Sequence, residues 1–126
     1  MSWALAIDNN SFKDSRPLQE LRPIIERLKA VFGLRALATI LNTDAGNLSR
    51  FLSGRRALSD QVARRSVDLD HVLMRAALIF ELDVIPDWLT GNEPFLRHAR
   101  PIDVLAVHGA GPLIVALDGI AAGSYA

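Results

Sequence analysis

The chain has 126 residues, half of them apolar and 22% of them charged, and this composition predicts a globular protein with a core of its own. It contains no cysteine, which excludes a disulfide framework, a thiolate metal site and a cysteine nucleophile. The formal net charge is zero, yet residues 1–67 carry 11 basic and 6 acidic side chains, whereas residues 68–126 carry 3 and 8, so we expect a polyanion to contact the first part and a protein to contact the second.

The first part of the chain has the pattern of a flexible arm followed by a helix. Residues 8–16 are polar and rich in turn-forming side chains, so we expect residues 1–16 to be flexible. Pro23 predicts the first position of a helix, because a proline there loses no helical hydrogen bond. Apolar side chains at helical spacing continue to residue 32, and Gly33 predicts a left-handed cap at the end of this helix.

Two short helices separated by a tight turn are predicted next, over residues 34–41 and 45–53. In the turn, Asn42 can take a left-handed conformation and Asp44 can cap the second helix. This layout is typical of a helix-turn-helix, whose second helix enters the major groove of DNA, and a plain helical hairpin with solvated arginines is the alternative. The candidate DNA-binding side chains are Asp44, Asn47, Ser49, Arg50, Arg55 and Arg56.

A long helix is expected after this hairpin, over residues 60–82, with Ser59 as its N-cap. Proline and glycine then delimit three short helices, at residues 86–90, 101–107 and 112–122. No segment alternates with period two, so no sheet is expected. The predicted architecture is all-α, with a helix-turn-helix bundle over residues 17–67 that the long helix joins to a small helical domain over residues 68–126.

The last predicted helix is apolar on nearly every face, because Asp118 is the one charged side chain among residues 110–126. A helix of this kind requires burial on all sides, and a terminal helix on a small domain leaves one face uncovered. We therefore expect this face to bind another protein, with complete burial in the core as the alternative. The small tail at residues 123–126 contains Tyr125, whose ring and hydroxyl suit a nucleotide pocket; a frayed terminus is the alternative.

No motif in the sequence points to catalysis or to a cofactor. A glycine-rich phosphate loop and a nucleophile motif are absent, and a metal site needs more ligands than Asp68 and His71 provide. We expect these two side chains to form an ion pair on a helix surface, and Trp88 to anchor the core. The expectation is a protein without enzymatic activity, metal or cofactor, and the lack of cysteine and of a membrane-length apolar run favours the cytoplasm.

Two parts of the sequence resemble a known family. Residues 37–54 resemble the helix-turn-helix of Xre-type regulators, and the second half of the chain resembles the toxin-binding domain of the Xre/MbcA/ParS antitoxins. The features that carry the second resemblance are Trp88-Leu89, Asn92, Pro94, Arg100-Pro101, Asp103-Val104-Leu105, Gly111, Val115–Leu117, Ile120, Gly123 and Tyr125. Together the two resemblances cover about residues 22–126.

The resemblance implies an antitoxin of a type II toxin–antitoxin pair. Its partner would be a RES-domain toxin, which degrades NAD or transfers ADP-ribose, and the C-terminal segment would cover the NAD cleft of that toxin. The implied toxin-binding residues are Leu113, Leu117, Ile120, Gly123, Ser124, Tyr125 and Ala126. The resemblance also implies repression of its own operon through operator DNA, a homodimer, and a larger hetero-oligomer with the toxin.

One feature of the predicted recognition helix departs from the family pattern. Ala45 and Gly46 stand where typical recognition helices carry polar side chains, so base readout would fall on Asn47 and Arg50. This departure puts operator recognition in doubt more than toxin binding. A stand-alone Xre-like DNA-binding transcription regulator is therefore the alternative function.

Overall fold

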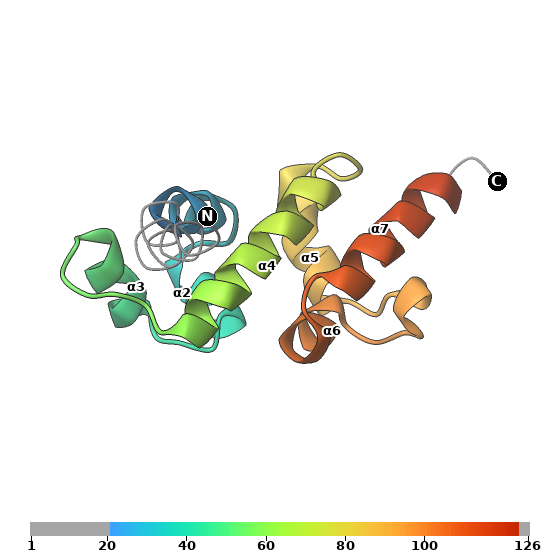
Figure 1. Cartoon of the computed structure of the whole chain (residues 1–126). Coiled ribbons are helices and arrows are strands. Elements are labelled where there is room, and N and C mark those ends of the chain that lie inside the picture. The colour runs from blue at the N-terminus through green and yellow to red at the C-terminus, as the bar shows by residue number, and fades with distance from the viewer. Residues whose placement is uncertain (1–20, 124–126) are drawn as a thin grey trace, which may run out of the picture.

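The structure is a computed structural model in which residues 21–123 are described. Within this span every regular element is a helix, and the one extended contact is an isolated bridge between Glu93 and Ala99. The predicted all-α fold is thus confirmed for the described residues (Figure 1). None of the helices in this span is both long enough and apolar enough to cross a membrane. The arm predicted over residues 1–16 lies outside the described residues.

The first part of the described chain is built from a helix at residues 21–32 and three further helices. These are α2 (Leu34–Ile40), α3 (Ala45–Leu52) and α4 (Asp60–Ala76). The prediction that Pro23 opens the first helix is wrong, because Leu21 and Arg22 are already helical. Leu21 is buried in the core, and this burial extends the helix on the N-terminal side of the proline.

The turns and caps between these helices follow the predictions from the sequence, except that Gly33 combines its positive φ with an extended ψ of 158° instead of the predicted left-handed conformation. Gly33 and Asn42 adopt positive φ angles of 81° and 57°, respectively. The carboxylate of Asp44 accepts a hydrogen bond of 2.7 Å from the backbone N–H of Asn47, which caps α3. The hydroxyl of Ser59 caps α4 in the same way. These local interactions fix where each helix begins, because they satisfy backbone N–H groups that have no partner inside the helix.

The long helix α4 ends at Ala76, earlier than the predicted residue 82. After Ala76 the chain forms a tighter turn, in which the N–H of Ile79 donates to the carbonyl of Ala76, three residues earlier, at 2.9 Å. Ile79 and Phe80 pack partly buried against the core, and the ring of Phe80 lies 6.0 Å from that of Trp88, centre to centre. The apolar spacing continues past the end of the helix because these side chains still face the core after the chain has turned.

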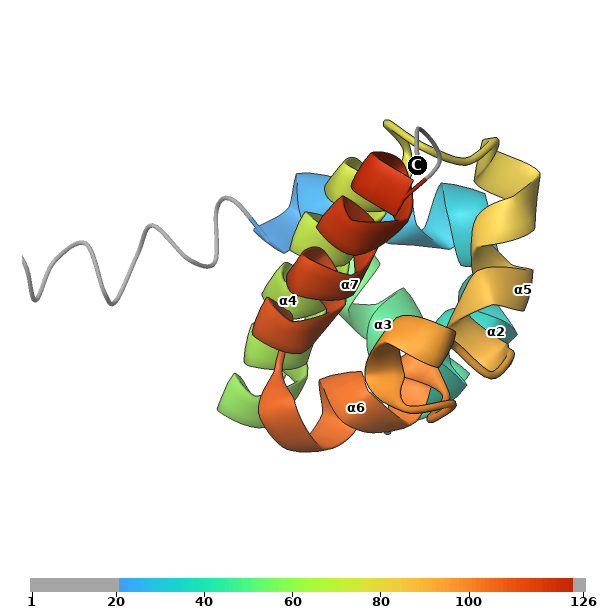
Figure 2. The same ribbon diagram turned by 90° about the vertical axis from the view of Figure 1, so that its right-hand side faces the viewer.

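The second part of the described chain consists of short helices, as predicted. They are η1 (Leu82–Val84), α5 (Ile85–Thr90), η2 (Pro94–Leu96), α6 (Pro101–His108) and α7 (Gly111–Gly123). In Figure 1, α4 runs through the middle of the molecule, with α2 and α3 on one side and α5, α6 and α7 on the other. Figure 2 shows α7 lying along α4, with α6 crossing near the first turns of α7.

One hydrophobic cluster extends through both parts of the fold. It includes Leu28 and Leu48 from the first part of the fold, Leu69 from α4, and Leu113 from α7. A charged pair also ties the helix at residues 21–32 to α4, since Arg27 donates to both carboxylate oxygens of the buried Asp70, at 3.2 and 2.9 Å. These hydrogen bonds raise the pKa of Arg27.

Candidate DNA-binding and protein-binding surfaces

Helix α3 lies at one end of the molecule (Figure 1) and has a polar face. Leu48 and Phe51 are buried and attach the helix to the core, so the opposite face points to solvent. The six polar residues predicted from the sequence lie on or beside this outer face, and we call them the α3 surface: Asp44, Asn47, Ser49, Arg50, Arg55 and Arg56. The amphipathic spacing of α3 therefore brings the predicted side chains to one end of the fold.

Three members of the α3 surface are joined by contacts at the start of the helix. Nη2 of Arg50 donates to Oδ1 of Asn47 at 2.8 Å and lies 3.8 Å from Oδ1 of Asp44. Nδ2 of Asn47 in turn donates to the hydroxyl of Thr43 at 3.2 Å. The guanidinium of Arg50 is thus held over the first turn of α3 while its side chain stays about half exposed.

Two further arginines follow α3 in the chain, and the second, Arg56, lines a pocket with Thr43 and Asn47 at the start of the helix. Both arginine side chains face solvent. Arg22 was not among the predicted residues, yet its Nη1 donates to the carbonyl of Leu52 at 2.6 Å, beside the end of α3. No signal in the sequence links residue 22 to residue 52, because only the packing of the first helix brings them together.

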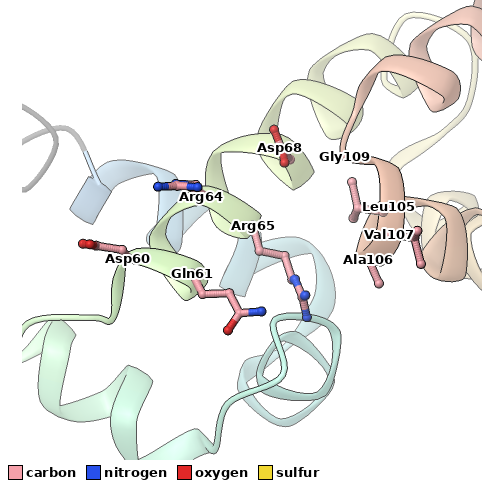
Figure 3. A pocket seen from close by; sticks show the side chains of 9 residues that line it. All are labelled: Asp60, Gln61, Arg64, Arg65, Asp68, Leu105, Ala106, Val107 and Gly109. Atoms are coloured by element: carbon pink, nitrogen blue, oxygen red, sulfur yellow. The ribbon is translucent and has the colours of Figure 1, made fainter.

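A cleft between α4 and α6 lies beside this basic region (Figure 3). Its charged lining residues come from α4 and include Asp60, Arg64, Arg65 and Asp68, and residues 105–107 form the facing apolar wall. Figure 3 shows Arg64, Arg65 and Asp68 extending in different directions. Because these charges do not converge on one point and are of both signs, the cleft does not have the geometry of a site for one small charged ligand.

Helix α7 is buried on one side and exposed on the other. Leu113 and Leu117, two of the predicted toxin-binding residues, have no exposed surface and belong to the core, so neither is accessible to a partner in this fold. Helical spacing turns both toward α4 and α6, while Val115 on the opposite face is 71% exposed. Ile120 packs partly buried against the core, and Gly123 is exposed at the end of the helix. The other predicted contacts, Ser124, Tyr125 and Ala126, lie outside the described residues.

Large apolar side chains remain exposed on α7 and on the elements beside it. We define the α7 apolar surface as the exposed side chains Met74, Leu78, Phe95 and Val115 together with Ile114, which is partly buried against the core. Met74, Leu78 and Ile114 line a shallow groove between α4 and α7 together with His71 and Arg75. Arg75 forms an ion pair with Asp118 across this groove.

Phe95 reaches α7 from the connection between α5 and α6. Its ring lies over Gly119, where a Cβ atom would come within 2.7 Å of the ring, so the missing side chain makes room for it. The backbone N–H of Phe95 donates to the buried carboxylate of Glu93 at 2.7 Å, and Nε1 of Trp88 donates to the same group at 2.9 Å. Trp88 thereby packs against the core, as predicted, and also anchors the segment that carries Phe95.

The predicted ion pair between Asp68 and His71 does not form among the described residues: His71 lines the groove beside Arg75, and Asp68 lies near Gly109. The described residues also hold no group of three or more His, Asp or Glu side chains placed to bind a metal.

Comparisons of the chain with protein-family models, with curated proteins and with solved structures find no match.

Proposed function

We propose that this protein is the antitoxin of a type II toxin–antitoxin pair, acting in the cytoplasm without catalysis of its own. In this proposal the α7 apolar surface and the C-terminal segment bind a RES-domain toxin and close its NAD cleft. The α3 surface contacts DNA and represses the operon. The resemblance to Xre/MbcA/ParS antitoxins supplies the identity of the partner, and the two separate surfaces support the division of labour.

The observation that carries this proposal is the α7 apolar surface. Leu78 is 80% exposed and Met74 58%, and both line the groove between α4 and α7; Phe95 is 56% exposed and packs over Gly119 of α7. Exposed apolar side chains gathered at one place are typical of a protein-binding site, because covering them removes apolar area from water. The acidic balance of the second half of the chain agrees with a protein partner rather than a nucleic acid.

A stand-alone DNA-binding regulator is the second candidate, and the α3 surface is the observation that favours it. Two short helices meet at residues 41–44 in a turn closed by Asn42 and Asp44, and the polar face of the second helix points to solvent. Exposed arginines beside such a face suit the phosphates and base edges of duplex DNA. This candidate predicts DNA binding with no need for a toxin.

The neutralisation assay that tests the first proposal uses a RES-domain protein encoded beside this chain. The measured quantity is toxin-catalysed loss of NAD with the antitoxin added in excess. Val115→Asp should weaken inhibition, because it places a charge on the exposed apolar face of α7. Val107→Asp is the matched control, since Val107 is equally exposed, at 76%, but lies on α6 outside that surface. Equal inhibition by both variants would reject the α7 apolar surface as the toxin contact.

The tail is tested in the same assay with a chain that lacks residues 124–126. We expect this truncated chain to bind the toxin through α7 but to leave NAD consumption active, because the tail occupies the cleft in this proposal. Complete inhibition by the truncated chain would assign neutralisation to the helix surface instead. If neither the intact chain nor its variants bind the toxin while duplex DNA is still bound, the second candidate replaces the first.

A further inference from the structure

Gly46 lies in the first turn of α3, directly beneath the guanidinium of Arg50. A Cβ atom at position 46 would lie 3.1 Å from Nη1 and 3.2 Å from Nη2 of Arg50, and 3.1 Å from Oδ1 of Asp44. All three distances are tighter than most contacts of real Cβ atoms in proteins. The absence of a side chain at this position therefore lets the guanidinium lie close to the helix.

The backbone gives no other reason for a glycine here. Gly46 is absent from the glycines with positive φ, so its conformation is one that alanine adopts readily. Glycine inside a helix also destabilises it relative to alanine. Glycine at this position destabilises the helix, and the backbone conformation does not require it. We therefore look for a purpose in the space that the missing side chain leaves, and the guanidinium of Arg50 occupies that space.

The surroundings of Arg50 leave most of its donors free and fix its orientation. One hydrogen bond of 2.8 Å to Asn47 uses a single donor at Nη2, out of the five that a guanidinium carries. A side chain that is already held in place loses less conformational freedom on binding. Asp44, 3.8 Å away, adds a negative charge to the same spot, and this charge disfavours a phosphate more than it disfavours a neutral base.

We propose that Gly46 and Asn47 are positioning residues that hold Arg50 to read a guanine in the major groove. The inference rests on the proposed contact between the α3 surface and DNA. The ligand is chosen by chemistry: a guanine presents the two acceptors O6 and N7 side by side, and the guanidinium fork donates to both. Under this inference the pair Ala45-Gly46 does not weaken operator recognition, because the glycine creates the place from which Arg50 reads.

The test begins with duplexes selected by the intact protein from a random DNA library at low salt. Each guanine of a selected duplex is then replaced in turn by 7-deazaguanine, which lacks N7. At one guanine position we expect the 7-deazaguanine replacement to lower the affinity of the intact protein by about tenfold. Arg50→Ala should bind the selected duplex and this modified duplex equally. Gly46→Ala should lose the same preference while circular dichroism shows unchanged helix content, and Asn47→Ala should lose part of it. Lys29→Ala removes an exposed cation outside the α3 surface; it is the control and should keep the full preference.

Each result decides the matter. If Arg50→Ala weakens binding to all duplexes equally and lowers the salt dependence by about one phosphate contact, Arg50 contacts the backbone and the guanine inference is wrong. If Gly46→Ala still discriminates against 7-deazaguanine, the positioning role of Gly46 is wrong although Arg50 reads the base. If no duplex is bound even at low salt, both the inference and the DNA-binding half of the proposed function fail, while inhibition of NAD loss still tests the toxin-binding half separately.

Discussion

The α3 surface and the α7 apolar surface lie at opposite ends of the molecule, and they meet water in different ways. On the α3 surface the polar groups bond to one another, as Asn47 does to Arg50. On the α7 apolar surface, Leu78 and Val115 are mostly exposed to solvent. Polar side chains are stable in water and still able to contact a charged ligand, whereas exposed apolar side chains gain free energy when a partner covers them. This difference supports the proposal that the α3 surface binds a nucleic acid and the α7 apolar surface binds a protein.

The two faces of α7 sharpen this comparison with the largest expected effect. Leu117→Ala should lower the free energy of unfolding by about 2–5 kcal/mol, because Leu117 is fully buried and its truncation leaves a cavity. Val115→Ala on the same helix should change it by no more than about 0.5 kcal/mol. Urea unfolding followed by circular dichroism gives both values. Similar losses for the two variants would show that Val115 is covered in solution.

The ion pair between Arg27 and Asp70 holds the helix at residues 21–32 on α4 and so supports the α3 end. Arg27→Ala should destabilise the fold by about 1.5–3 kcal/mol, because it leaves a buried carboxylate without its charged donor. Adding Asp70→Asn should recover part of that loss. Urea unfolding of the two single variants and the double variant measures the coupling, and strictly additive losses would show that the pair contributes nothing.

Self-association provides a third test, since the α7 apolar surface can also be covered by a second copy of the chain. We expect the free protein to be a dimer at micromolar concentration, with a mass near twice 13.8 kDa. Leu78→Asp should shift the mass toward the monomer, because it places a charge beside the groove between α4 and α7. Light scattering measures this, with Val107→Asp as the control. A monomeric intact protein would contradict the prediction.

The smallest expected effect concerns acid stability in the second part of the chain. Hydrogen bonds from Arg100 lower the pKa of the Asp103 carboxyl below its ordinary value. The stabilisation is therefore present above the ordinary pKa of an aspartate and is lost as the pH falls through the lowered one. Between about pH 6 and about pH 3, the urea midpoint should fall slightly more for the intact protein than for Asp103→Asn. Parallel curves would show that this exposed pair adds nothing to stability.

The features that the sequence predicts well are the local ones. Gly33, Asn42, Asp44 and Ser59 act within a few residues of themselves, so their cap and turn roles can be predicted without knowing the fold. The boundaries of the short helices follow for the same reason, because proline and glycine interrupt the helical pattern. The all-α class follows from apolar spacing alone.

The features that the sequence does not predict depend on packing between distant segments. The end of α4 is one case, since Ile79 and Phe80 remain apolar after the chain has turned. The buried face of α7 is another: the helix is apolar all round, so its composition cannot separate Leu117 from Val115. Phe95 over Gly119 joins residues far apart in the chain, and no spacing rule connects them.

The central claim, that the two ends have separate partners, is tested most directly by measuring two variants in both assays. Arg50→Ala and Val115→Asp are each assayed for binding to the selected duplex and for inhibition of toxin-catalysed NAD loss. We predict that Arg50→Ala weakens DNA binding by about 1–3 kcal/mol and inhibits the toxin fully, whereas Val115→Asp binds DNA normally and inhibits poorly. Separate partners for the two ends are contradicted if a variant with unchanged helix content loses both activities together, or if Val115→Asp inhibits as well as the intact protein.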